Sequence, residues 1–359
     1  MRRTSVAAGL GIALCLAAGA FAAEPLYVPG LALLLMAAIA AGWVSLAARG
    51  AQVLRLVGGA AVEEQTPLRL TVRVQRSGLP PPSAEVQAFP EGSLTPLRGG
   101  TGATVTTAVR FPRRGRHRLG PASVTISDPL GLCRRAAFSA FDEVLVLPRI
   151  LPLHSGEVGG AAGVLWSRRA STAEEGANEV DSLQEYRPGS PASRIHWPTV
   201  ARTTSLMERR LVADEDQRPL VVVDPREPSS AAALDDAMRA SASLCVHLAR
   251  HGGCALLLPS DRRPTRLDPE LHGFAELHAR LALLEPEAGG PPLGCLTGAE
   301  VVLWVTAATG GSTVLAQLRA PVRYLVSPHP ESKWHTQFTV AGCSGQRLER
   351  ARTKRRAAA

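Results

Sequence analysis

The side chains best able to take part in chemistry gather in residues 176–216, around Arg194, His196, Trp197 and Arg202. The histidine offers a donor and an acceptor, the tryptophan an apolar body with one N–H, and the arginines planar forks for carboxylates or carbonyls. Such a set can fix a short helix to a neighbouring sheet. It can equally bind a partner protein, because Arg and Trp are frequent interface residues. The sequence leaves both interpretations open.

A hydrolase would need His196 to act with a carboxylate, for which Asp181 and Glu185 are the candidates. Covalent catalysis requires a nucleophile beside a base that a third group orients. The segment has no recognisable pair of this kind, and neither His-Glu-x-x-His nor Gly-x-Ser-x-Gly occurs in the chain. We therefore expect no catalytic residue and no enzyme activity, and keep this hydrolase as the alternative.

Two histidines elsewhere, His247 and His251, are four residues apart in a segment with helical spacing. That is the spacing of a pair of metal ligands on one helix face. The sequence shows no third ligand for them, and cationic groups at the end of a helix also suit its dipole. We interpret the pair as a solvated helix end, and expect neither a metal nor a cofactor.

Two charge-free stretches, 4–23 and 25–48, precede these groups and are separated by Glu24. Each has about the 20 residues that a helix needs to cross roughly 30 Å of hydrocarbon. In lipid every backbone polar group must be satisfied within the segment, which favours helices. Residues 1–50 are therefore predicted to form two transmembrane helices.

The orientation of these helices follows from Arg2 and Arg3 before the first and Arg49 and Arg55 after the second. Cations stay on the cytoplasmic side, so a two-pass protein of the inner (plasma) membrane with both termini in the cytoplasm is predicted. Alternatively, residues 1–22 could be a cleaved signal peptide, because they end in a small-x-small pattern. A single remaining span would still leave the body of the chain in the cytoplasm.

Residues 51–150 change to a period of two, as in 68–74, where apolar and polar residues alternate. Short runs of this kind between Pro- and Gly-rich turns predict a β-sandwich-like domain. The turns at 113–116 and 128–132 contain Gly or Asp-Pro, which supply turn geometry without chemistry. The first turn is also rich in arginine and could contact anionic lipid, given its expected nearness to the membrane.

Residues 219–328 alternate buried strands with helices. Continuous apolar runs at 219–224, 254–258 and 301–305 are typical of strands covered on both faces, and 229–251 has helical spacing. This order predicts an α/β domain with a parallel sheet between helices.

The overall composition excludes several classes of protein. The net charge of +9 comes almost wholly from arginine, and neither Lys333 nor Lys354 follows a Gly-rich loop, so a P-loop nucleotidase is excluded. Only 4% of residues are aromatic, which argues against nucleic acid as a partner and favours membrane lipid. Six widely spaced cysteines fit a reducing compartment. Residues 329–359 are interpreted as a basic tail.

Residues 151–218 resemble the signature segment of a bacterial family called domain of unknown function 58. Its signature runs Arg-x-Tyr-x-x-Gly-Asp, then Arg-x-Ile-His-Trp, then Ala-Arg, and the resemblance extends back to the two spans, so it covers most of the chain. Ser190 stands where the family usually has Asp. The matching positions, which are also the candidate partner-binding residues, are Tyr186, Gly189, Arg194, Ile195, His196, Trp197, Ala201 and Arg202.

The resemblance implies a von Willebrand factor A-like fold for the α/β domain. In that fold a metal binds where the first strand ends, through an Asp-x-Ser-x-Ser loop. Here Asp224 is followed by Pro225, Arg226, Glu227 and Pro228, so both serines are missing. Hard cations need several oxygen ligands, so Asp224 marks a degenerate metal position. A metal-dependent ligand-binding module is a further alternative that this loss disfavours.

The resemblance also implies partners, namely a MoxR-type AAA+ ATPase and a transglutaminase-like membrane protein. Such proteins act together in the assembly or maturation of envelope or metal-containing complexes. We therefore expect a non-enzymatic adaptor or scaffold tethered to the membrane.

Overall fold

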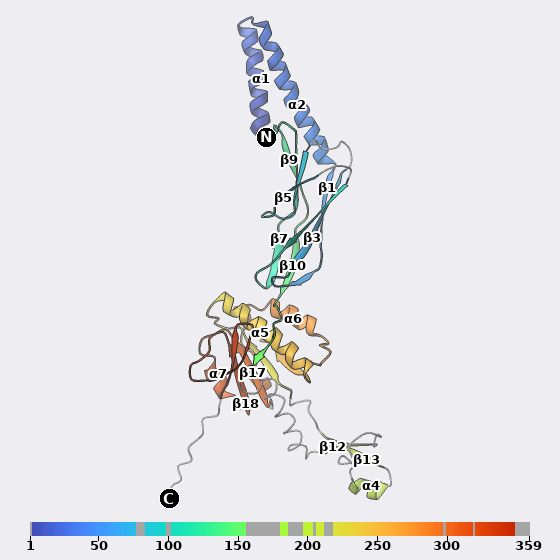
Figure 1. The fold of residues 1–359 in the computed structure, drawn as a ribbon, viewed down its shortest axis with the longest axis vertical. Coiled ribbons are helices and arrows are strands. Elements are labelled where there is room, and N and C mark those ends of the chain that lie inside the picture. Colours follow the sequence, from blue (N-terminus) through green and yellow to red (C-terminus); the bar gives the residue numbers. More distant parts are fainter. Residues whose placement is uncertain are drawn as a thin grey trace. The chain divides into compact units, whose positions relative to one another are not determined.

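The computed structural model describes residues 2–76, 83–97, 102–155, 180–185, 197–203, 206–211, 218–296, 299–318 and 320–348 (Figure 1). All structural statements below concern these residues. The chain divides into two compact units, 1–146 and 147–359, and each is described by itself.

Unit 1 begins with two antiparallel helices, α1 (Arg2–Ala20) and α2 (Tyr27–Arg49), joined by the short 3-10 helix η1 (Glu24–Leu26). The prediction of two apolar N-terminal helices is confirmed. Their backbones approach closely, since a Cβ added at Gly11 would lie 2.9 Å from the carbonyl oxygen of Gly30. Small residues at such crossings allow the close packing that replaces the hydrophobic effect in lipid.

Most side chains of α1 and α2 point away from the protein, although nearly all are apolar. Leu16 and Val28 are 68% and 73% exposed, and the helices are long and apolar enough to cross a membrane. A soluble helix of this composition would bury a broad stripe. The exposure is compatible with a membrane anchor.

The remainder of unit 1, called the β-region here (residues 51–146), has three sheets. Their strand orders are β1-β3-β6, β5-β4-β8-β9 and β2-β10-β7. The strands are β1 (Ala51–Val57), β2 (Ala61–Glu63), β3 (Leu68–Arg76), β4 (Ser83–Gln87), β5 (Leu94–Pro96), β6 (Gly102–Val109), β7 (Gly115–Leu119), β8 (Ser123–Ser127), β9 (Arg134–Phe138) and β10 (Asp142–Leu147).

Alternate residues of these strands meet in two cores, as the alternating pattern requires. Val72 and Val74 of β3 share one core with Ile126 of β8, and the last turns of α2 add Val44 and Ala47 to it. The other core includes Leu68, Leu70, Phe111, Leu119, Val144 and Val146. Helix α2 is thus packed into the β-region at one end.

The strand register identifies which end that is. Ala51, which follows α2, pairs with Arg76, whereas the other end of β3, Leu68, pairs with Val109. The basic turn at 113–116 follows Val109, about 27 Å along the strand from α2. The expectation that this turn lies near the membrane end is wrong, because β6 carries the chain away from the hairpin.

Arg55 also differs from its expected place on the inner membrane flank. Its side chain is completely buried in the β-region and forms an ion pair with Asp142. The alternation of β1 turns Arg55 inward together with Val53. Arg49, the last residue of α2, is exposed.

Unit 2 is built on one eight-stranded mixed sheet with the order β11-β19-β20-β18-β17-β14-β15-β16. Its four central strands are parallel and the outer ones antiparallel. The strands are β11 (His154–Ser155), β14 (Leu220–Asp224), β15 (Cys254–Leu257), β16 (Thr265–Leu267), β17 (Val301–Thr306), β18 (Val322–Ser327), β19 (Thr336–Val340) and β20 (Cys343–Arg347). The helices are α5 (Ala231–Arg250), α6 (Phe274–Ala282), η3 (Pro286–Ala288), η4 (Leu293–Leu296) and α7 (Ser312–Gln317).

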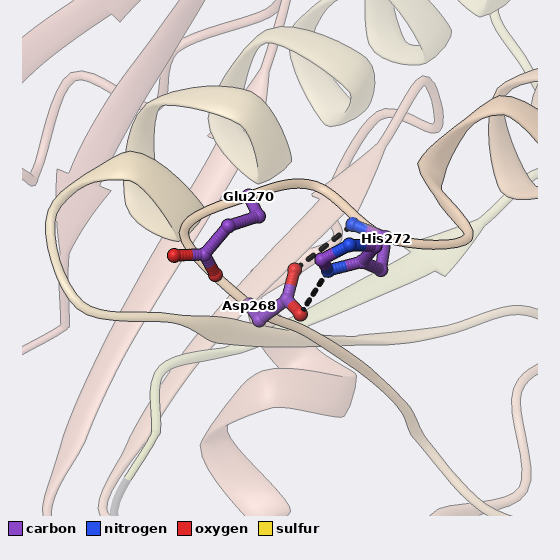
Figure 2. A group of neighbouring side chains, drawn as sticks. All are labelled: Asp268, Glu270 and His272. Atoms are coloured by element: carbon purple, nitrogen blue, oxygen red, sulfur yellow. Dashed lines mark hydrogen bonds and ion pairs between the residues drawn. The ribbon is translucent and has the colours of Figure 1, made fainter.

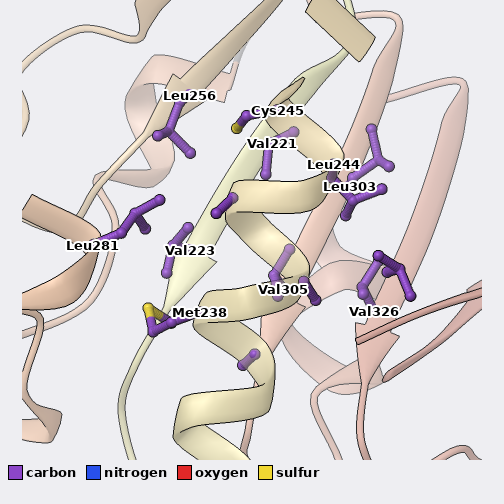
Figure 3. Packing of buried hydrophobic residues seen from close by; sticks show 14 of the residues in the cluster. Val221, Val223, Met238, Leu244, Cys245, Leu256, Leu281, Leu303, Val305 and Val326 are labelled. Atoms are coloured by element: carbon purple, nitrogen blue, oxygen red, sulfur yellow. The ribbon is translucent and has the colours of Figure 1, made fainter. Parts of the chain in front are cut away.

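Both faces of the sheet are covered. Val221 and Val223 of β14 pack with Leu244 of α5 in the larger core (Figure 3). The intervening Val222 packs on the opposite face with Leu315 of α7. Mixed α/β content is thus confirmed, and the continuous apolar runs arise because each strand is buried on both sides.

Residues 336–347 form β19 and β20, although the sequence analysis placed them in a basic tail. Phe338 and Val340 face the larger core, and Gly342 makes the turn between the strands with φ +79°. The tail interpretation is wrong here. The reason is that β20 is mostly polar and joins the sheet through its backbone, which composition does not reveal.

A separate pair of antiparallel strands, β12 (Val180–Glu185) and β13 (Met207–Leu211), encloses helix α4 (Trp197–Thr203) in the chain.

Candidate functional site

The structure describes only part of the signature. Trp197, Ala201 and Arg202 lie on α4 and are exposed, Trp197 by 61%. The other candidate positions lie outside the described residues; they are Tyr186, Gly189, Arg194, Ile195 and His196. Trp197 therefore offers a large exposed aromatic surface on α4, of the kind that interface residues provide.

The carboxyl end of the parallel strands is the place where ligands bind in open α/β sheets. Strand β14 ends in Asp224, which is in register with Thr306, the last residue of β17. After β14 the chain continues through α5 to β15, which lies on one side of β14. The later strand β17 lies on the other side of β14, so the strand order reverses at β14. Asp224 is buried at this switch point.

The carboxylate of Asp224 is bound by Arg226. The guanidinium donates from Nε to Oδ1 at 2.8 Å and from Nη2 to Oδ2 at 2.9 Å, and the backbone N–H of Arg226 adds a contact of 3.3 Å to Oδ1. This hydrogen bonding, more than the charge of the aspartate, raises the pKa of Arg226. A Cβ added at Gly290 would lie 2.6 Å from Cζ of Arg226, so a larger residue there would require the guanidinium to shift.

Asp224 is consequently a poor metal ligand in this arrangement. Both of its oxygens accept hydrogen bonds from a cation, and the hydroxyl of Thr306 accepts from the backbone N–H of Ala308. The residues present do not fit a divalent ion, which needs several free oxygens. Arg226 instead supplies the positive charge at the end of β14.

A serine and a histidine meet at the same edge of the sheet. The Oγ of Ser229, after β14, lies 2.5 Å from Nε2 of His329, after β18, and both residues are exposed. Sequence reasoning missed this pair because 100 residues separate its members. Among the described residues no carboxylate hydrogen-bonds to His329 to orient it as a base, so the pair lacks the third member of a catalytic triad.

Asp268, Glu270 and His272 form a second cluster, in the loop before α6 (Figure 2). Their ligand atoms lie within 4.8 Å of one another, which is compatible with a metal ion. However, His272 Nδ1 lies 2.6 Å from Asp268 Oδ2, and this hydrogen bond raises the pKa of His272 and lowers that of Asp268. A metal would have to displace that proton from a solvent-exposed pair.

The rings of His247 and His251 lie in tilted contact at the end of α5, with ring centroids 4.5 Å apart. Nδ1 of His251 contacts the carbonyl oxygen of His247 at 2.7 Å, while Nε2 of His247 is buried without a partner. Burial, and then the neighbouring His251, lower the pKa of His247. His247 is thus partly buried and His251 exposed, and no described third ligand completes a metal site with them.

A groove of about 440 Å³ lies at the outer edge of the sheet, beside the turn between β19 and β20. Cys343 lines it, and burial together with the nearby Asp236 raises the pKa of this thiol to about 12. The thiol therefore stays protonated near neutral pH and is a poor nucleophile. The groove is lined by Leu151, Pro152, His154, Thr339, Val340, Ala341, Gly342, Cys343 and Ser344.

No part of the described structure thus combines a nucleophile, an oriented base and a place for substrate. No model of a known protein family matches the sequence, and no curated protein matches it.

Proposed function

We propose that the protein is a non-enzymatic adaptor, tethered to the inner (plasma) membrane by α1 and α2. The observation that carries this proposal is the exposure of their apolar side chains along almost the whole hairpin. Burying such side chains in lipid is favourable by about 25 cal/mol per Å² of apolar surface. The packing of Val44 and Ala47 into the β-region joins the anchor to a folded body.

The charges at the open end of the hairpin, where α1 begins and α2 ends, support an orientation with both termini in the cytoplasm. Arg3 lies in the first turn of α1 and Arg49 ends α2, at the same end of the antiparallel pair, and both are exposed. The opposite end carries Glu24 and no described cation. Positive flanks remain on the cytoplasmic side.

The absence of a complete catalytic set in the described residues favours binding over catalysis. In the proposed von Willebrand factor A-like unit, Arg226 occupies the carboxylate that would otherwise bind a metal. The exposed Trp197 and Arg202 on α4 are candidates for the contact with a partner. By resemblance, that partner is a MoxR-type AAA+ ATPase, acting with a transglutaminase-like membrane protein in assembly of envelope or metal-containing complexes.

Crosslinking of the detergent-solubilised chain, followed by mass spectrometry, tests the adaptor. An AAA+ ATPase should be recovered with the wild type and lost with the double variant Trp197→Ala/Arg202→Ala. Leu293→Ala, at another exposed apolar side chain of unit 2, should retain it and serves as the matched control. Recovery of no AAA+ ATPase with any of the three proteins would contradict the proposal.

A further inference from the structure

The turn between β8 and β9 is rigid and has an apolar tip. Asp128 accepts hydrogen bonds from the backbone N–H groups of Leu130 at 3.0 Å and Cys133 at 2.5 Å, and its own carbonyl accepts from Gly131 at 3.0 Å. Burial alone raises the pKa of Asp128, but backbone hydrogen bonds, chiefly from Cys133, outweigh it and lower the pKa below its usual value. Leu130, at the tip, is 65% exposed.

This turn lies beside the first residues of α1. The hydroxyl of Thr4 donates to the carbonyl oxygen of Leu132 at 2.5 Å. A Cβ added at Gly131 would lie 3.8 Å from Nη1 of Arg3. Because Arg3 and Thr4 open the first membrane helix, the turn is at the level where the hairpin enters the bilayer; Figure 1 shows β9 reaching the N-terminus.

Exposed cations follow this turn in the chain and lie at the ends of the two helices. Arg134 and Arg135 follow the turn directly as the first residues of β9, and Arg3 and Arg49 mark the two helix ends. All four are exposed. An apolar side chain among arginines is the combination that binds the interface of an anionic membrane, where the leucine enters the acyl boundary and the guanidinium groups meet phosphates.

We propose that residues 128–135 form a second membrane contact, with the headgroup layer of an anionic phospholipid bilayer. Leu130 enters this layer, while Arg134 and Arg135, with Arg3, bind lipid phosphates. The inference rests on the proposed anchor and goes beyond it, because the contact fixes the orientation of the β-region on the membrane surface. Without this contact, only the packing of α2 against the β-region would set that orientation.

The contact can be tested with the full chain in lipid nanodiscs that contain phosphatidylglycerol and phosphatidylcholine. Leu130→Trp places a fluorophore at the tip. Leu94→Trp is the matched control, because Leu94 is 58% exposed on the same sheet but pairs with Gln87, at the end remote from the turn. Lipids brominated near the headgroup should quench the added emission of Leu130→Trp at least about twofold more than that of Leu94→Trp. Equal quenching would overturn the proposal.

The charge requirement is tested by adding Arg134→Glu/Arg135→Glu to the Leu130→Trp chain. Quenching should fall toward the Leu94→Trp level, whereas Arg110→Glu, an exposed arginine after β6 at the remote end, should leave it unchanged. Unchanged quenching in the double variant would overturn the role of the arginines. Failure of the wild-type chain to enter nanodiscs would refute the anchor itself, and entry without quenching at residue 130 would refute only this contact.

Discussion

Arg55 in the β-region and Arg226 in unit 2 each bind one aspartate, but their surroundings differ. The side chain of Arg55 is fully buried and contacts Asp142 at 2.6 Å through Nε, together with the carbonyl oxygens of Ala88, Leu119 and Gly120. Arg226 is 46% exposed, and its partner is only two residues away. The first pair joins distant strands and loops, whereas the second neutralises one strand end.

This difference separates a structural ion pair from a pair at a candidate site. Removing one member of a buried pair leaves a charge or several carbonyls without partners, which is costly. A half-exposed guanidinium is replaced in part by water, so its loss costs less. The stability of the β-region should thus depend on Arg55 far more than that of unit 2 depends on Arg226.

The largest effect is expected for Arg55→Leu. It removes every hydrogen bond of the guanidinium and leaves three carbonyl oxygens and the partly buried Asp142 without their donor, so the free energy of unfolding should fall by about 3 kcal/mol. Denaturant unfolding of the detergent-solubilised protein measures this change. Arg116→Leu, at an arginine that is 4.0 Å from Glu143 and exposed, is the control and should cost about 0.5 kcal/mol or less. Equal losses in both variants would contradict the structural role of Arg55.

A smaller effect is expected for Arg226→Ala. Asp224 is buried and would lose both side-chain donors, which should cost about 1–2 kcal/mol. The double variant Arg226→Ala/Asp224→Asn should recover part of that loss, because it removes the unpaired charge. If calorimetry showed Mg²⁺ binding to the wild type, the account of this strand end would be wrong.

Asp128 differs from Asp142 and Asp224, because backbone N–H groups rather than an arginine stabilise its charge. Asp128→Asn should cost about 1 kcal/mol at neutral pH. Since the folded-state pKa of Asp128 is lowered, its contribution is present above about pH 4, the usual aspartate value, and is lost as the pH falls through the lowered pKa. Thermal unfolding of wild type and variant as a function of pH measures this, and a difference that did not shrink as the pH fell below about 4 would contradict it.

The smallest effect is expected for the exposed pair of Asp268 and His272. The raised pKa of His272 means that its pairing with Asp268 favours the folded state below about pH 6.5, the usual histidine value. This small stabilisation is lost as the pH rises through the raised pKa. NMR titration should show the His272 ring protonating at higher pH in the wild type than in Asp268→Asn, with no measurable change in unfolding. His272→Gln identifies the signal. Identical titrations would show that the hydrogen bond does not form in solution.

The helices and the central strands could be predicted because their signals are local. The charge-free stretches 4–23 and 25–48 correspond to α1 and α2, and the apolar run at 219–224 contains β14. Strands β19 and β20 were missed, because a polar hairpin that joins a sheet through its backbone resembles a tail in composition. Arg55 was misplaced for a related reason, since its burial depends on Asp142, 87 residues away.

The candidate site was less accessible to sequence reasoning. Asp224 was found through the family resemblance, which implies a metal position at the end of this strand, but its binding by Arg226 needs the geometry of the chain. Ser229 and His329 come together only through the sheet. The spacing of Asp268, Glu270 and His272 was visible in the sequence, and alternate positions in one short loop would have been the signal to follow.

A reporter fused after Ala359 tests the membrane anchor and its orientation most directly. A fluorescent protein that matures only in the cytoplasm should be active there and should remain with the membranes after alkaline extraction, while a chain lacking residues 1–49 should be released. Activity of an export-dependent reporter at the same position, or release of the full-length fusion by alkali, would contradict the account.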